Sequence, residues 1–107
     1  AFFDITPANE GHTLIIPKKH YVNIFEIDDK TIERIAIVAK KIALKNKEVL
    51  GSENCNLIQS NGKLANQDIL HFHMHVVPRS SNDGINIWQG KKSIKPNFKE
   101  LLEKLKF

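Results

Sequence analysis

The longest periodic pattern of the chain lies between residues 28 and 51 and predicts a helix. Asp28 or Asp29 can cap its start, and Gly51 is a plausible stop. Lysines crowd the C-terminal half, where positive charge suits the helix dipole. Apolar residues recur at i, i+3 and i+4 spacing, which gives one apolar stripe: Ile32, Ile35, Ala36, Ala39, Ile42 and Ala43.

Shorter apolar runs predict strands. Phe2–Ile5 reads as the end of a strand, and His12–Ile16 is a β-branched apolar run that Pro17 stops. Further strands are predicted at Asn56–Ser60 and Ile69–Val77, on either side of a turn at Asn61-Gly62 and a polar loop. Strands and a long helix without regular alternation indicate an α+β fold with an antiparallel sheet.

The end of the chain has a second helical pattern. Pro96 can start a helix, and four apolar residues then share one face: Phe98, Leu101, Leu102 and Leu105. With 107 residues and no repeat or linker, we expect a single domain over residues 1–107. Its core would lie in residues 1–90, followed by a helical tail over residues 91–107.

Composition excludes several classes of protein. Hydrophobic residues make up 41% and charged residues 26% of the chain, the balance of a soluble globular protein. No apolar run approaches the roughly 18–20 residues of a membrane helix, and no signal peptide opens the chain. The single cysteine, Cys55, is expected to be a small buried residue in a reducing compartment, so a cytoplasmic location is predicted.

The formal net charge of +4 comes mostly from scattered lysines. No arginine-rich stripe, aromatic platform or recognition helix accompanies them, so a nucleic-acid partner is not expected. A small anionic ligand fits this surplus of positive charge better than a nucleic-acid polymer does.

Three histidines alternate with apolar residues in His71–Pro78, the least expected pattern in the chain. Because a strand turns successive side chains to opposite faces, His71, His73 and His75 would share one face. The other face would carry core residues, Phe72, Met74 and Val76. Histidine titrates near neutral pH, which suits it to proton transfer, nucleophilic attack and metal binding.

Strand geometry argues against a shared metal ion. Residues i and i+4 of a strand lie roughly 13 Å apart, whereas zinc-binding nitrogens lie ~2 Å from the metal. One of the three could still join a partner elsewhere, such as His20. A nucleophilic role fits better, because His73 would have a neighbouring imidazole on each side to orient it or to contact a bound anion. The preceding segment Ser60–Asp68 is placed to be an anion-binding loop.

The run His71–Val77 resembles the signature of the histidine triad (HIT) family, in which three histidines alternate with apolar residues. Gly11–His20 is similar to the family's second hallmark, Gly-His, an apolar strand and Pro-Lys-x-His. Phe2–Ile5 resembles the segment before it, and Pro78-Arg79 is common in bacterial Hit-like members. The resemblance covers about residues 1–88. It implies an antiparallel sheet of about five strands with one long helix packed on it and a C-terminal helix.

The resemblance also implies a function. HIT proteins are nucleotide hydrolases and transferases that act at the α-phosphate, and they form homodimers. His73 would attack phosphorus, His75 would contact the phosphate or leaving group, and His71 would support the orientation of His73. His12 matches a fourth histidine near the phosphates. The remaining residues matched to nucleotide binding are Phe2, Asp4, Ile5, Ser60, Gln67 and Asp68.

Two departures from the family pattern affect the loop. Ser60 stands where Asn or Gln is usual, and Asp68 stands where a Ser or Thr hydroxyl is usual. An ionised Asp68 cannot donate a hydrogen bond and would repel phosphate, although it could accept a proton from a histidine or an amine.

The resulting hypothesis is a cytoplasmic hydrolase of purine nucleoside 5′-phosphoramidates or adenylylated compounds that requires no cofactor. Dinucleoside polyphosphate hydrolysis, towards which Arg79 tilts slightly, and a non-catalytic nucleotide-binding module are the alternatives. The family fold begins before the region that matches Ala1, so an N-terminal part is expected to be missing. Some members carry a Cys pair there, and a longer form could hold structural zinc with His20 and His71.

Overall fold

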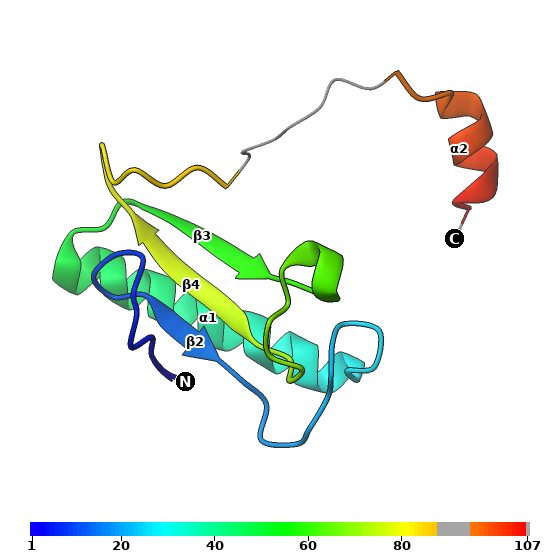
Figure 1. The fold of residues 1–107 in the computed structure, drawn as a ribbon. Helices are drawn as coiled ribbons and strands as arrows, with labels where there is room; N and C mark the ends of the chain where they lie inside the picture. The colour runs from blue at the N-terminus through cyan, green and yellow to red at the C-terminus, as the bar shows by residue number, and fades with distance from the viewer. Residues whose placement is uncertain (88–94, 107) are drawn as a thin grey trace.

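A four-stranded antiparallel sheet with one long helix on one face forms the main body of the chain (Figure 1). The structure is a computed structural model that describes residues 1–87 and 95–106. In chain order, the elements are β1 (Phe2–Phe3), β2 (Thr13–Ile15), α1 (Asp29–Leu50), β3 (Asn54–Gln59), a 3-10 turn (Lys63–Ala65), β4 (Met74–Arg79) and α2 (Phe98–Lys104). The strand order is β1-β2-β4-β3. The α+β prediction is confirmed, with four strands among the described residues where about five were expected.

The predicted ends of the long helix are confirmed. The Asp28 side chain accepts a hydrogen bond from the Thr31 backbone N–H at 2.8 Å, which satisfies one of the free donors of the first turn. At the other end Gly51 has φ 68°, and its N–H donates to the Asn46 carbonyl. A glycine adopts this left-handed conformation without strain, so α1 stops there.

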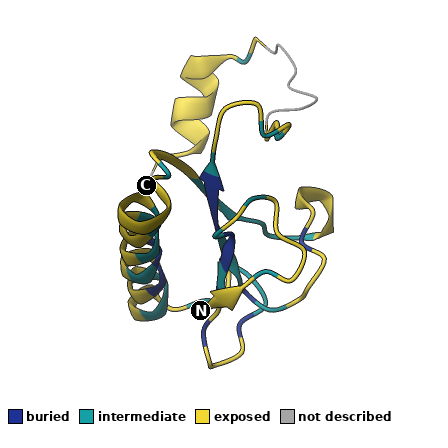
Figure 2. Cartoon of the chain, turned by 90° about the vertical axis from the view of Figure 1, so that its left-hand side faces the viewer, coloured by how far each residue is buried: buried dark blue, intermediate teal, exposed yellow. Residues whose placement is uncertain are grey.

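The core lies between α1 and the sheet (Figure 2). Ile35 and Ala39 on the helix meet Ile15 from β2, Val76 from β4 and Phe72 just before β4. Phe72 and Val76 are fully buried. Phe72, Met74 and Val76, the apolar residues between and after the histidines, therefore face the helix, as their spacing predicted. The histidines face the other side of the sheet.

The predicted strand over Ile69–Val77 is wrong in its first half, because β4 begins only at Met74. The neighbouring strands explain the late start. Both β2 and β3 end at the level of Met74, which pairs with Ile15 on one side and Gln59 on the other. Residues before Met74 have no ladder partner, and the Phe72 N–H instead donates to the Tyr21 carbonyl at 2.7 Å.

Cys55 is exposed, contrary to the expectation that it is buried. It lies on β3, which stands at the edge of the sheet, and shares a strand face with Leu57, which is also exposed.

The C-terminal helix forms two residues later than its proposed start at Pro96. Asn97 caps α2, which contacts no other described helix or strand. Residues 91–94 and 107 of the predicted tail lie outside the described residues. Within the described part, neither helix has the length and apolar character needed to cross a bilayer.

Candidate active site

The histidine face of the sheet opens onto a cavity of about 590 Å³. All three histidines of the alternating run line it, although only His75 belongs to β4. His75 pairs across the sheet with Leu14, which lines the same cavity. Two further segments complete the walls: residues 2–6 before β2, and Asn66, Asp68 and Ile69 before β4.

His73 is held so that one ring nitrogen stays free. Its Nδ1 lies 2.7 Å from the carbonyl oxygen of His71. A carbonyl only accepts hydrogen bonds, so Nδ1 carries the proton, and the neutral ring has its lone pair on Nε2. An imidazole with this free lone pair and a fixed orientation is the form needed for nucleophilic attack. The backbone of His71 therefore sets the tautomer of His73.

His75 is set in the opposite tautomer by a chain of two hydrogen bonds. The Ala8 backbone N–H donates to His12 Nδ1 at 3.0 Å, so the neutral His12 ring carries its proton on Nε2. That nitrogen lies 2.9 Å from His75 Nδ1 and donates to it. The proton of neutral His75 is then on Nε2. One backbone amide thus makes His75 a hydrogen-bond donor, while His73 keeps an acceptor nitrogen.

Burial and charge shift two pKa values in this group. Burial lowers the pKa of His75, with smaller effects from His12 and His73, while Asp4 raises it in part. The pKa of the Asp4 carboxyl is lowered chiefly by the Thr6 backbone N–H, which donates to its Oδ1 at 2.9 Å. A neutral His75 imidazole near an anionic Asp4 carboxylate follows from these two directions at neutral pH.

The same residues form the one group of three potential metal ligands among the described residues. The donor atoms of Asp4, His12 and His75 lie within 4.8 Å of one another. The Ala8 amide opposes ligation, because a His12 ring that accepts at Nδ1 carries a proton on the Nε2 that a metal would need. The chemistry of this donor set therefore favours a hydrogen-bond relay over a metal centre.

His20 and His71 form a separate pair. The His71 Nε2 lies 3.0 Å from the Pro17 carbonyl and donates to it, so its Nδ1 has a free lone pair. His20 Nδ1 lies 2.7 Å from that atom, and the two rings stack at 5.0 Å between centroids. Since His20 does not line the cavity, it has no direct place beside the His73 nucleophile.

Gln67 and Ser60, both matched to nucleotide binding, do not line the cavity. The Gln67 side chain is almost fully buried inside its own loop. Its amide nitrogen donates to the carbonyls of Val22 at 2.6 Å and Ile69 at 3.1 Å, and its oxygen accepts from Gly62 N–H at 2.8 Å. Asp68, the next residue, does line the cavity and is exposed.

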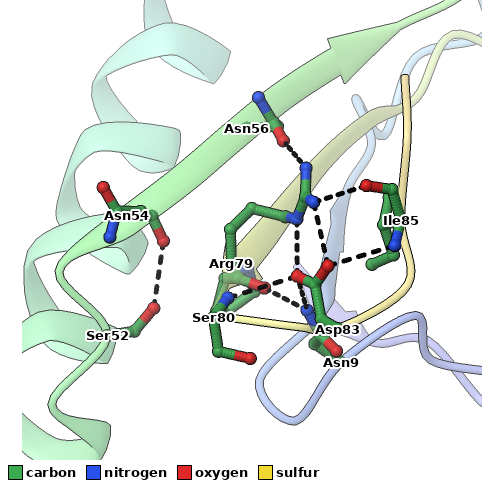
Figure 3. Close-up of polar contacts among 9 residues, drawn as sticks. Asn9, Ser52, Asn54, Asn56, Arg79, Ser80, Asp83 and Ile85 are labelled. Atoms are coloured by element: carbon green, nitrogen blue, oxygen red, sulfur yellow. Dashed lines mark hydrogen bonds and ion pairs between the residues drawn. The ribbon is translucent and has the colours of Figure 1, made fainter. Parts of the chain in front are cut away.

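Arg79 lies at the far end of β4, outside the cavity, and its guanidinium donates four hydrogen bonds (Figure 3). Nε and one terminal nitrogen donate to the two oxygens of Asp83 at 2.7 and 2.9 Å. The remaining bonds go to the Asn56 side chain at 2.7 Å and the Ile85 carbonyl at 2.8 Å. Asn9 donates to Asp83 and to Pro78, which ties the loop before β2 to this cluster. These contacts tie Arg79 to β3 and to the segment that follows β4, and Arg79 does not line the cavity.

The N-terminal segment brings Phe2, Asp4 and Ile5 to the cavity, as expected. Asp4 stands before a Thr-Pro turn and stabilises it, because its Oδ1 accepts from the Thr6 backbone N–H and hydroxyl. Its Oδ2 lies 3.6 Å from His12 Nε2. Sequence reasoning missed the amide of Ala8, for which no residue type gives a signal.

Comparisons with known proteins agree with this arrangement. The HIT domain family model matches residues 1–82. An uncharacterised HIT-like protein of Mycoplasma genitalium is 37% identical over 107 aligned residues, which cover 96% of this chain and 76% of that protein. The adenosine 5′-monophosphoramidase of Schizosaccharomyces pombe is 36% identical over 83 residues, which cover 78% of this chain and 59% of that enzyme.

Among solved structures, a zinc-bound histidine triad family protein from Mycobacterium smegmatis superposes with a TM-score of 0.74 at 37% identity. The superposition covers 79% of this chain and 62% of the mycobacterial chain. The chain thus spans about three fifths of the length of the yeast enzyme and of the mycobacterial protein.

Proposed function

This chain belongs to the HIT domain family, and we propose that it hydrolyses purine nucleoside 5′-phosphoramidates or related adenylylated compounds at the α-phosphate. The observation that carries the proposal is the free Nε2 of His73, fixed by the 2.7 Å bond from its Nδ1 to the His71 carbonyl. A relative of known name, the yeast adenosine 5′-monophosphoramidase, supports the same substrate class.

The reaction would proceed in two displacements at phosphorus. In the first, His73 Nε2 forms a bond to the α-phosphorus while the bond to the leaving nitrogen breaks, giving a nucleotidyl-histidine. In the second, water attacks the phosphorus, His73 leaves, and the nucleoside monophosphate is released. The leaving nitrogen takes up one proton and the attacking water gives one up, so the histidines return to their starting state.

His75 would stabilise the charge that develops on the phosphate oxygens or on the leaving group. The relay from Ala8 through His12 keeps a proton on its Nε2, so it donates a hydrogen bond without first rearranging. A donor that is already oriented in a partly buried site stabilises a transition state more than solvent does. Phe2 and Ile5 would contact the purine, and Asp4 the ribose hydroxyls, because all three line the cavity on one segment.

The test is to trap the adduct. Brief incubation with adenosine 5′-phosphoramidate, followed by denaturation and mass spectrometry, should reveal one nucleotidyl group on the peptide that contains His73. His73→Ala should lose the adduct and at least ~1000-fold of AMP release, because the residual reaction lacks the covalent route. Cys55→Ser, which removes an exposed thiol on β3 away from the cavity, should retain both.

A result in which His73→Ala releases AMP at the wild-type rate would exclude the nucleotidyl-histidine. Nucleotide binding by the wild type without release from any substrate would instead identify a non-catalytic binding module. Dinucleoside polyphosphates stay the alternative substrate class, towards which the Pro78-Arg79 motif tilts slightly, although the Arg79 guanidinium itself is bonded to Asp83, Asn56 and Ile85.

We also propose that His20 and His71 hold a structural zinc ion in a longer form of the protein. The two residues fit the role, because their Nδ1 atoms lie 2.7 Å apart and His71 donates its other N–H to a backbone carbonyl, as metal-bound histidines do. Such an ion would stabilise the fold and supply no catalytic chemistry. Two further ligands would be required for a tetrahedral site.

A further inference from the structure

Asp68 is a carboxylate on the wall of the cavity that has no partner within the described chain. It lines the cavity together with His71, His73 and His75. Among the described residues, no hydrogen bond or ion pair involves its side chain, although it is exposed and near other polar groups. An anion left unpaired at the edge of a nucleotide site is unexpected, because it would repel a phosphate.

The rest of the cavity wall does not compensate this charge. None of the described residues that line it is a lysine or an arginine. The other acid, Asp4, is bonded to Thr6 and lies beside His12, so its charge is partly balanced. Since burial lowers the pKa of His75, that imidazole adds no positive charge at neutral pH. Asp68 therefore dominates the electrostatics of the part of the cavity formed by residues 66–69.

The position of Asp68 identifies what it would face. Phe2, Asp4 and Ile5 line the cavity from the N-terminal segment, which the proposed function assigns to the base and ribose. The α-phosphate lies between His73 and His75 in that assignment. The remaining part of a bound substrate, its leaving group, then extends towards the segment that contains Asn66, Asp68 and Ile69.

We propose that Asp68 determines substrate choice by selecting leaving groups that are cationic amines, such as the nucleoside phosphoramidates of a diamine or of lysine. A carboxylate accepts hydrogen bonds from an ammonium group and pairs with its charge. It repels the additional phosphates that a dinucleoside polyphosphate places at the same position. This inference rests on the proposed function and decides between its two candidate substrate classes.

A matched pair of substrates isolates the charge. The adenosine 5′-phosphoramidates of 1-hexylamine and of 1,6-diaminohexane differ at the far end of the leaving group, where the second carries an ammonium. The wild type should cleave the diamine compound with a kcat/KM about tenfold higher, the size expected for one charge pair in a partly solvated cavity. Diadenosine polyphosphate should be the poorest of the three.

Asp68→Asn removes the charge and keeps the shape. It should make the two hexyl substrates equivalent and raise the relative rate on diadenosine polyphosphate about tenfold. Glu53→Gln, which neutralises an exposed acid that does not line the cavity, should keep the wild-type ratios.

Equal rates for the two hexyl compounds in the wild type, or a ratio unchanged in Asp68→Asn, would overturn the role of Asp68 and leave the hydrolase intact. Absence of AMP release from all three substrates by the wild type would overturn the proposed function itself. The two failures are therefore distinguished within one set of assays.

Discussion

His73 and His75 stand two residues apart, yet their neighbours give them opposite tasks. His73 donates a hydrogen bond from Nδ1 to the His71 carbonyl, so its Nε2 carries a free lone pair. The Ala8 amide, acting through His12, makes His75 offer a proton. The same residue type thus presents an acceptor nitrogen at position 73, through one backbone carbonyl, and a donor nitrogen at position 75, through a backbone amide and the His12 side chain.

The surroundings of His75 also predict the direction in which its pKa is shifted. Its pKa should lie below the ordinary value of about 6.5, because burial disfavours the charged ring. Asp4→Asn should lower it further, since the Asp4 charge raises it. Two-dimensional NMR of the ring protons as a function of pH measures both values, and Asp29→Asn, on the helix, serves as the control.

The sign of the stability effect follows from the same shift. Above about pH 6.5, His75 is neutral in both the folded and the unfolded chain and contributes nothing. As the pH falls below that value, the unfolded chain binds a proton that folded His75 does not, so the free energy of unfolding decreases. A His75 pKa above the ordinary histidine value would contradict this account. So would a His75 pKa that is higher in Asp4→Asn than in the wild type.

At the residue scale, the sequence predicted which residues gather at the cavity but not which atoms they present. Alternation of three histidines predicted a site around His73, and the family resemblance added Phe2, Asp4 and Ile5, which line the same cavity. Which nitrogen each ring presents depends on a contact between His12 and His75, 63 positions apart, and on backbone groups. Spacing carries no information about such contacts. For the same reason it did not reveal that Gln67 is directed into its own loop.

The loop between β3 and β4 brings Asp68 to the cavity, and Gln67 is the residue that holds it. The Gln67 amide joins three backbone groups, from Val22, Gly62 and Ile69. It therefore connects this loop to the segment before α1. A buried amide of this kind fixes the position of its neighbours, so we expect Gln67 to position Asn66 and Asp68, although it does not itself line the cavity.

Gln67→Ala should lower the free energy of unfolding by about 2–4 kcal/mol, because it leaves buried backbone groups without partners. It should also raise the KM for nucleotide, since Asn66 and Asp68 lose their support. Urea denaturation measures the first effect and steady-state kinetics the second. Leu64→Ala, in the same loop at a fully exposed position, should change stability by no more than about 0.5 kcal/mol. Equal effects of the two substitutions would contradict the role given to Gln67.

At the scale of helices and strands, the sequence predicted the ends of an element correctly where residues next to that end determine it. Asp28 and Gly51 mark the ends of α1, and both act through neighbouring backbone groups. The start of β4 could not be found in this way, because a strand extends only as far as its neighbours do. Pro17 ends the run of β2 early, and β3 stops at Gln59, so the histidine run enters the sheet only at Met74. The exposure of Cys55 depends likewise on β3 being an edge strand.

The charge of the whole molecule is unevenly distributed along the chain. Residues 91–107 contain six lysines and two glutamates, which equals the net charge of +4, so residues 1–90 are neutral overall. The positive surplus was expected to suit a small anionic ligand. The described lining of the cavity contains neither lysine nor arginine. The proposed recognition of a nucleotide therefore relies on oriented donors such as His75 within that lining.

Two surfaces of the body are exposed and suited to contact with another chain, and we propose that a second copy covers them. Within the described residues, β3 pairs only with β4, so its outer edge offers free backbone groups, and Leu57 on it is half exposed. Ile37 and Leu44 lie two turns apart on α1, along one stripe, and are also about half exposed. Exposed strand edges and apolar stripes are costly unless another chain covers them.

We therefore predict a homodimer at micromolar concentrations, measured by sedimentation velocity. Leu57→Glu and Leu44→Glu should each weaken the dimer at least about tenfold, because each places a charge in an apolar interface. Leu64→Glu, at a fully exposed position beside the cavity loop, should leave the dimer intact and so controls for added charge. A wild-type chain that sediments as a monomer would contradict the predicted homodimer. A dimer insensitive to Leu57→Glu and Leu44→Glu but lost in Leu64→Glu would instead move the interface from the sheet edge and α1 to the cavity side. The dimer and the active site would then compete for one surface, and nucleotide would dissociate the dimer.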